Sequence, residues 1–295
     1  MGSWIGRWIA AFLIGSGIWA FLVSGDKVDG MAPTPGEIWN IAHRGASGHA
    51  PESTLPAFML ADKMGADWIE LDVQMTRDGH LVALHDDQVD RTTNGKGPVR
   101  NFTLAELKQL DAGTWFGKKY PRRWKPEYQG TSIPTLEEVL TQMGNRVRYC
   151  LEIKENSAGP RLEGKLLELL KQHGLWNPAQ PGNRVVIQSF DRQTLKRLHH
   201  QAPEITLIQL IHFREARSVS PKLLREVQVY AEGIGYHHRQ MDRDDVRRAQ
   251  SHGLRIHPYT VNRKKDMRRL IRWGVDGICT NYPDRLQRVL KESAS

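Results

Sequence analysis

Acidic, cationic and imidazole side chains stand at the ends of several apolar runs in this sequence. They are His43 with Arg44, Glu70 with Asp72, His85, and Glu152 with Lys154. The carboxylates can hold a metal ion, Arg and Lys can bind an anion, and the imidazoles can transfer a proton. Their repeated position at the ends of apolar runs favours a shared site over a set of separate surface salt bridges.

The sequence Glu70-x-Asp72 predicts a cation site. In a strand, residues i and i+2 point to the same side and lie about 7 Å apart, and like charges that close are costly without a cation or proton between them. Glu152, which follows an apolar run, adds a third carboxylate. Three carboxylates suit one divalent cation, Mg²⁺ or Ca²⁺, better than Zn²⁺. Taken singly, each of these carboxylates could equally form a salt bridge to a neighbouring Lys or Arg.

The remaining groups indicate phosphodiester chemistry. Cleavage of a diester needs charge neutralisation, a base for the nucleophile and an acid for the leaving alkoxide. Arg44 is suited to hold two phosphate oxygens at once, and Lys154 adds a point charge. His43 and His85 are the natural acid–base pair, because imidazole titrates near neutral pH.

The elements that must position these residues alternate between short β-rich runs and amphipathic helical stretches, which predicts a mostly parallel sheet. Nine strands are expected, at Ile38–His43, Trp68–Val73, Leu81–His85, Arg148–Lys154, Val185–Phe190, Thr206–Ile211, Glu232–Tyr236, Leu254–Val261 and Gly277–Thr280. The second and third are too close for a parallel crossover and must form a hairpin. Eight parallel units remain, which predicts an α/β fold of the TIM-type (β/α)8 barrel class.

The carboxyl ends of the strands in such a barrel carry the active site. The candidate residues all lie there, joined by Gln188 and Asn281 at two further strand ends. If Asp78-Gly79 forms a two-residue hairpin turn, His85 lies opposite Asp72 and shares a face with Glu70. A three-residue loop would shift this register by one.

The N-terminus is expected to lie outside the barrel. Trp8 to Val23 is apolar except for Ser16 and follows Arg7, which fits either a transmembrane anchor or a signal peptide over residues 1–25. Residues 26–37 then form a linker, and 38–292 the catalytic barrel with an insertion at 87–132. Either interpretation places that domain on the extracytoplasmic side, anchored to the membrane or secreted after cleavage.

The net charge of the chain indicates which kind of ligand it binds. The chain of 295 residues has a formal net charge of +9, which favours anionic ligands such as phosphate esters or lipid headgroups. No nucleic-acid-reading module is present, and the basic residues from Lys118 to Lys125 cluster in the insertion, where they either shape the substrate site or form a plain exposed loop. Cys150 and Cys279 lie in apolar runs and are expected to be buried free thiols. The oligomeric state is left open.

Long motifs extend this interpretation. IAHRGASGHAPESTLPAF, GADWIELDVQMTRDGHLVALHDDQVDRTTNGKGPV, CLEIK, QSF, PYTVN and GICTNYPD stand in this order, and the chain from about Ile38 to Leu290 closely resembles the glycerophosphodiester phosphodiesterase family. The resemblance implies a metal held by Glu70, Asp72 and Glu152, acid–base catalysis by His43 and His85, and phosphate binding by Arg44 and Lys154. It also implies attack by the glycerol 2-hydroxyl, a cyclic phosphate, and release of glycerol 3-phosphate and an alcohol.

Two positions depart from the family pattern. Glu52-Ser53-Thr54 stands where the family usually has Glu-Asn-Thr. Glu52 is retained, so we expect it to bind the metal or to support the residues that do. Ser53 is expected to cap the helix that begins at Thr54. Tyr259 replaces the usual Trp before Thr-Val-Asn and is expected to line the substrate pocket.

Two other substrates and one non-enzymatic function are also compatible with the sequence. The same site could act on lysophospholipids or on a teichoic-acid-like glycerophosphate polymer. A third alternative, from another functional class, is an inert barrel that binds phosphate or lipid, but inert relatives normally lose acid–base or metal residues that this chain retains.

Overall fold

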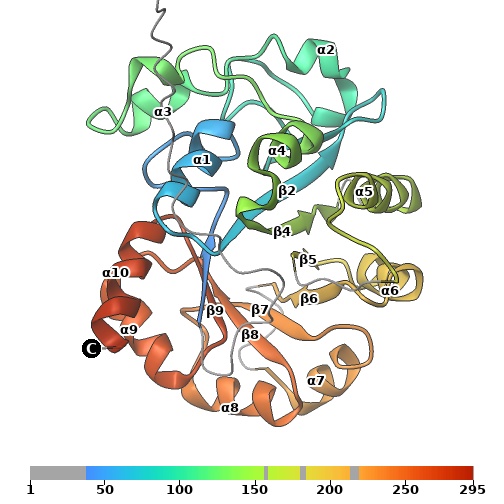
Figure 1. Ribbon diagram of the computed structural model, residues 1–295, viewed down its shortest axis with the longest axis vertical. Helices are drawn as coiled ribbons and strands as arrows, with labels where there is room; N and C mark the ends of the chain where they lie inside the picture. Colours follow the sequence, from blue (N-terminus) through green and yellow to red (C-terminus); the bar gives the residue numbers. More distant parts are fainter. Residues whose placement is uncertain (1–37, 156–158, 180–183, 213–218, 295) are drawn as a thin grey trace, which may run out of the picture.

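The computed structural model describes residues 38–155, 159–179, 184–212 and 219–294, and it has the architecture of a (β/α)8 barrel (Figure 1). Eight parallel strands form the inner layer. They are β1 (Trp39–Ala42), β2 (Trp68–Met75), β4 (Arg148–Ile153), β5 (Val185–Ser189), β6 (Thr206–Leu210), β7 (Gly233–His237), β8 (Arg255–Tyr259) and β9 (Gly277–Thr280). The predicted barrel is confirmed over these residues.

The strands follow one another around the barrel in the order β8-β7-β6-β5-β4-β2-β1-β9. The ring is nearly closed, because backbone hydrogen bonds from Asp276 N to Ile256 O (3.2 Å) and from Val261 N to Cys279 O (2.9 Å) join the β8 and β9 regions. Closure brings the carboxyl ends of β1, β2, β4 and β9 to the same end of the barrel, where the predicted site residues lie.

The barrel interior is apolar at its base. An inner cluster is formed by Trp39, Ile41, Trp68, Cys150, Val186, Ile208 and Cys279. The rings of Trp39 and Trp68 stack with centroids 4.4 Å apart. Because side chains alternate along a strand, the face of β2 that buries Trp68 also carries Glu70 and Asp72 further along. Both cysteines are free and buried, as expected.

The outer layer consists of helices that pack their apolar faces on the strands. They are α1 (Leu55–Lys63), α4 (Leu136–Met143), α5 (Pro160–Gln172), α6 (Arg192–Gln201), α7 (Pro221–Val227), α8 (Arg243–Ser251), α9 (Lys264–Trp273) and α10 (Pro283–Ala294). Side-chain caps define several helix starts, as the reciprocal bonds between Thr135 and Glu138 do for α4. In α1 the cap is Thr54, whose hydroxyl accepts from Ala57 N at 3.4 Å. The prediction that Ser53 caps this helix is therefore wrong.

The hairpin register is one residue away from the predicted one. In β3 (Leu81–Ala83), Val82 pairs with Gln74, and Leu84 N donates to Asp72 O at 3.1 Å. The loop has three residues, Arg77 to Gly79, rather than two, and Gly79 takes the positive φ of +89° that closes such a loop. The predicted pairing of His85 with Asp72 is wrong, and β3 ends two residues before His85.

Residues 87–132 carry two short helices, α2 (Leu104–Leu107) and α3 (Thr114–Lys119), and the 3-10 turns η1 (Val99–Asn101) and η2 (Pro126–Tyr128). Figure 1 shows α2 and α3 beyond α1 and α4, on the side of the barrel away from α7 and α8. Several cations of this segment lie over aromatic rings, as Lys119 does over Trp115 and Tyr120. Those cations thus have partners within the protein.

The predicted anchor or signal peptide at 1–25 and the linker at 26–37 lie outside the described residues. Among the helices that are described, none combines the length and the apolar character needed to cross a membrane.

Candidate active site

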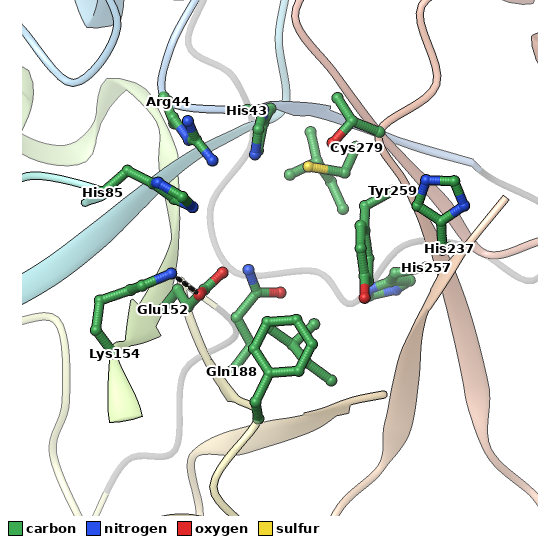
Figure 2. A pocket seen from close by; sticks show the side chains of 14 residues that line it. His43, Arg44, His85, Glu152, Lys154, Gln188, His237, His257, Tyr259 and Cys279 are labelled. Atoms are coloured by element: carbon green, nitrogen blue, oxygen red, sulfur yellow. Dashed lines mark hydrogen bonds and ion pairs between the residues drawn. The ribbon is translucent and has the colours of Figure 1, made fainter. Parts of the chain in front are cut away.

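A cavity of about 230 Å³ opens at the carboxyl ends of the strands. Its walls are Ile41, His43, Arg44, His85, Glu152, Lys154, Gln188, Phe190, Leu210, His237, His257, Tyr259, Thr260 and Cys279. Figure 2 shows two sides: Arg44, His43, His85, Lys154 and Glu152 gather on one, and Tyr259, His237 and His257 on the other. None of the described lining residues comes from the insertion at 87–132, so that segment influences the cavity only through its neighbours.

Three carboxylates lie together at this end of the barrel, and one of them, Glu152, lines the cavity. Glu70, Asp72 and Glu152 each offer an oxygen, and these atoms lie within 4.8 Å of one another. Asp72 and Glu152 are partners in the parallel register of β2 and β4. All three are buried. Burial raises the pKa of Glu70 well above its usual value, reinforced by the charges of Asp72 and Glu152. Burial also raises the pKa of Glu152, against the opposing effect of Lys154.

The donor set fits a hard divalent cation. Oε1 of Glu70 and both carboxylate oxygens of Asp72 are buried without a hydrogen-bond partner among the described residues. Arg44 and Lys154 lie at ion-pair distance from the Asp72 oxygens, whereas Glu70 forms no ion pair among the described residues. A buried carboxylate oxygen such as Oε1 of Glu70 is costly unless a cation or a proton satisfies it. A second group within reach, His43, Glu70 and Cys279, includes a thiol. Burial raises the pKa of Cys279 well above its usual value, which keeps it a weakly binding thiol. The three carboxylates are therefore the better site.

Arg44 and Lys154 lie against these carboxylates. Arg44 Nε is 3.3 Å from Asp72, and Lys154 Nζ is 2.7 Å from Glu152 and 3.5 Å from Asp72. Although burial opposes it, these two cations hold the pKa of Asp72 below its usual value. Arg44 has a φ of +56°, a conformation that non-glycine residues rarely adopt, and its backbone N donates to Glu70 at 2.7 Å. Strain of this kind persists only where surrounding contacts fix the residue.

His43 is held by an amide from the last strand's end. Its Nδ1 lies 2.7 Å from Oδ1 of Asn281, and Asn281 N donates to Asn262 Oδ1 at 2.9 Å. Because an amide oxygen only accepts, Nδ1 of His43 carries the proton and Nε2 keeps a lone pair. Burial and the neighbouring Arg44 lower the pKa of His43 to about 3. The ring is therefore neutral near pH 7.

His85 is held by a carboxylate instead. Its Nδ1 lies 2.5 Å from Asp86, and Arg91 bonds both Asp86 (2.5 Å) and Glu52 (2.6 Å). Glu52 also pairs with Arg44 at 2.8 Å. Glu52 thus belongs to a chain of ion pairs that runs from His85 through Asp86 and Arg91 to Arg44. It lies outside the three-carboxylate cluster.

The sequence reasoning missed Asp86, Arg91 and Gln74. Gln74 is buried on the same face of β2 as Asp72, and its amide donates to Leu84 O at 2.8 Å and Asp86 O at 2.7 Å. The available signal was the alternation that puts residues 70, 72 and 74 on one side of a strand. Asp86 directly follows His85 in the sequence, and this position could have indicated a carboxylate partner for the imidazole.

The opposite wall is aromatic and imidazole-rich. Tyr259 lines it, with its hydroxyl donating to Ile211 O at 2.8 Å. Phe190 meets the Tyr259 ring edge-on and stacks on His212 with centroids 4.2 Å apart. His257 lies behind Tyr259 in Figure 2. The sequence predicted Tyr259 and Gln188 on this cavity but neither histidine nor Phe190.

Comparison with known proteins agrees with this geometry. Residues 43–285 match the model of the "Glycerophosphoryl diester phosphodiesterase family". A Bacillus subtilis glycerophosphodiester phosphodiesterase is 42% identical over 287 residues, covering 97% of this chain and 98% of the relative. One from Caldanaerobacter subterraneus is 38% identical, covering 85% and 97%.

A solved structure is similar in fold as well as in sequence. It is an Oleispira antarctica phosphodiesterase in complex with the product sn-glycerol-3-phosphate, 32% identical, with a TM-score of 0.73 over 85% of this chain and 96% of that one. The family match covers most of the chain and includes every one of the proposed catalytic, phosphate-binding and metal-binding residues. The chain is therefore a member of the glycerophosphoryl diester phosphodiesterase family, as the sequence motifs predicted.

Proposed function

We propose that this enzyme hydrolyses glycerophosphodiesters to glycerol 3-phosphate and an alcohol. The observation that carries the proposal is the three-carboxylate cluster with His43 and His85 beside it, each ring held through Nδ1 and pointing into the cavity (Figure 2). Such an arrangement provides a cation site and two proton-transfer groups around one point. The names of the relatives and the product bound in the Oleispira structure agree with this activity.

Glu70, Asp72 and Glu152 would hold one divalent cation, Mg²⁺ or Ca²⁺. When bound, such an ion neutralises negative charge on the phosphate. Arg44 and Lys154 lie within reach of the same point and now pair with these carboxylates. With cation and substrate present, their N–H groups are free to turn from the carboxylates to the non-bridging phosphate oxygens.

The neutral His43 is suited to be the base of the first step. Its Nε2 lone pair accepts the proton of the glycerol 2-hydroxyl, whose oxygen forms a bond to phosphorus. The bond from phosphorus to the leaving oxygen breaks, and His85 gives its Nε2 proton to that oxygen. The negative charge of Asp86 offsets the charge of the protonated ring. The products of this step are the free alcohol and a cyclic glycerophosphate.

The second step runs these proton transfers in reverse. His85, now neutral, accepts a proton from water as the water oxygen bonds to phosphorus. The ring bond to the 2-oxygen breaks, and His43 returns its proton to that oxygen. Glycerol 3-phosphate leaves, and both histidines regain their starting states.

The test is release of glycerol 3-phosphate from glycerophosphocholine, glycerophosphoethanolamine and glycerophosphoglycerol, measured side by side. We expect turnover that a chelator abolishes and that Mg²⁺ or Ca²⁺ restores. Release from none of the three diesters with either ion would refute the proposal, and so would full activity in the chelator-treated enzyme.

For location, we propose that residues 1–25 direct the barrel to the extracytoplasmic side. The support is the sequence alone, an apolar run after Arg7. Fractionation of cells that express the full chain with a C-terminal tag tests this. The tag should be found in the membrane or the medium, and a purely cytosolic tag would contradict the proposal.

A further inference from the structure

Arg123 belongs to the long insertion, yet its side chain reaches the loops at the catalytic end of the barrel. Its Nη1 donates to the carbonyl oxygen of Gly48 and, over 3.0 Å, to the hydroxyl oxygen of Tyr282. Gly48 lies in the loop after β1, and Tyr282 lies between β9 and α10. One guanidinium group thus joins the loop that follows the first strand to the segment that follows the last one.

These two segments also carry the proposed base and the residue that holds it. His43 begins the loop after β1, and Asn281 directly precedes Tyr282. The side chain of Asn281 holds His43, with Oδ1 2.7 Å from Nδ1 of the ring. The backbone oxygen of Asn281 accepts from the backbone N of Gly48 at 2.8 Å. A shift of either Gly48 or Tyr282 would therefore move the oxygen that orients His43.

The contact between the two segments is close. The ring of Tyr282 lies against Gly48, where an added Cβ would be only 2.3 Å from the ring carbon Cε1. The guanidinium of Arg123 also lies 5.4 Å from the centroid of the Tyr282 ring and 5.8 Å from that of Tyr120. Tyr120 is itself part of the insertion, so Arg123 is fixed on the side from which it reaches the two loops.

We propose that Arg123 is a positioning residue for His43. By holding Gly48 and Tyr282 together it keeps Asn281 bonded to Nδ1, which leaves Nε2 facing the glycerol 2-hydroxyl. Arg123 is not among the described residues that line the catalytic cavity, so it acts through these neighbours and not on the substrate. The inference rests on the proposed function, because it takes His43 as the base of the first step.

Replacing Arg123 with alanine tests this role. We expect kcat for glycerophosphoglycerol to fall about tenfold, because a small misplacement of a proton-transfer group costs rate. The loss should be partial, since Asn262 Oδ1 still accepts from Asn281 N at 2.9 Å. KM and the affinity for Mg²⁺ or Ca²⁺ should change little. Arg122→Ala is the matched control, because it removes the adjacent, exposed arginine and the same charge.

The leaving group distinguishes a defect at His43 from one at His85. A p-nitrophenyl leaving group needs no proton, so it relieves a defect at His85 but not one at His43. Arg123→Ala should therefore show the same tenfold loss with this substrate. Recovery of the rate would overturn the inference, because it would assign Arg123 to the other histidine. A fall in cation affinity as large as the fall in kcat would also overturn it, as a sign of general loss of structure.

Tyr282→Phe tests the contact in a variant that keeps the ring. Loss of the hydroxyl should lower kcat about threefold in the otherwise unchanged enzyme and should add no further loss to Arg123→Ala. Additive losses, or full activity in Arg123→Ala, would overturn the inference. Failure of the proposed function is distinct, because then the unchanged enzyme would release glycerol 3-phosphate from no diester.

Discussion

Gln74 donates its side-chain amide to the backbone carbonyls on both sides of His85, to Leu84 O at 2.8 Å and to Asp86 O at 2.7 Å. β3 has ended by this point, so no strand pairing fixes the loop that carries His85. The amide replaces that pairing with two hydrogen bonds, the first buried and the second partly buried. Gln74 is therefore a positioning residue for His85, on the strand that also carries Glu70 and Asp72.

Replacing Gln74 with leucine should release this loop. We expect kcat to fall about 10- to 100-fold with little change in KM or cation affinity, because misplacement of a proton-transfer group costs rate rather than binding. Gln172→Leu, which removes an exposed amide at the end of α5, is the control. Equal losses in kcat and cation affinity would instead indicate a general loss of structure.

The two histidines should differ in their response to the leaving group. Removing His43 or His85 by alanine should each lower kcat about 10²- to 10⁴-fold on natural diesters. With a p-nitrophenyl leaving group, which needs no proton, His85→Ala should recover most of the loss and His43→Ala should not. His49→Ala is the control, since His49 pairs with Asp284 outside the cavity. Equal recovery in both variants would contradict the assigned roles.

Asp86→Asn should follow the pattern of His85→Ala in weaker form. The amide still accepts from Nδ1 of His85 but no longer offsets its positive charge, so we expect kcat to fall about tenfold or more on natural diesters. Arg91→Ala should have a smaller effect, because Asp86 keeps its bond to His85. The p-nitrophenyl substrate should reduce both defects, and an undiminished defect would mean that Asp86 acts elsewhere.

Cation binding should depend on pH. Burial and the neighbouring carboxylates raise the pKa of Glu70, so without a cation this group tends to hold a proton that the ion must displace. Affinity for Mg²⁺ or Ca²⁺ should therefore weaken as pH falls. Calorimetric titration in two buffers of different ionisation enthalpy measures the proton released. Glu70→Gln should abolish tight binding, and an affinity independent of pH would argue against the three-carboxylate site.

His257 should make the protein less stable in acid. Burial, and the nearby Arg255, lower its pKa to about 3, while the unfolded chain takes up the proton near the ordinary value of 6.5. Between these values the unfolded state binds more protons, so stability falls as pH falls. His257→Leu should remove this loss, worth about 2 kcal/mol between pH 7 and pH 5. Urea unfolding at both values measures it, with the exposed His200→Leu as a control that should retain the full loss.

The sequence determined the order of the strands and helices and the residue types at the strand ends. Alternation of side chains, turn dipeptides and apolar spacing are local signals, and they placed Glu70 and Asp72 on one face of one strand correctly. The order of the strands also made β2 and β4 neighbours, whereas the register that pairs Asp72 with Glu152 is seen only in the structure. The motifs also identified the family, and the comparisons confirmed it.

Only the tertiary structure decided the hairpin register and the partners of each histidine. Asp78 accepts hydrogen bonds from Thr76 and from the first residue of α2, which enlarges the loop beyond the turn that Asp78-Gly79 favours in isolation. His43 depends on Asn281, 238 residues away, because barrel closure sets the last strand beside the first. Contacts over such separations depend on how the layers pack, a property that no local pattern encodes.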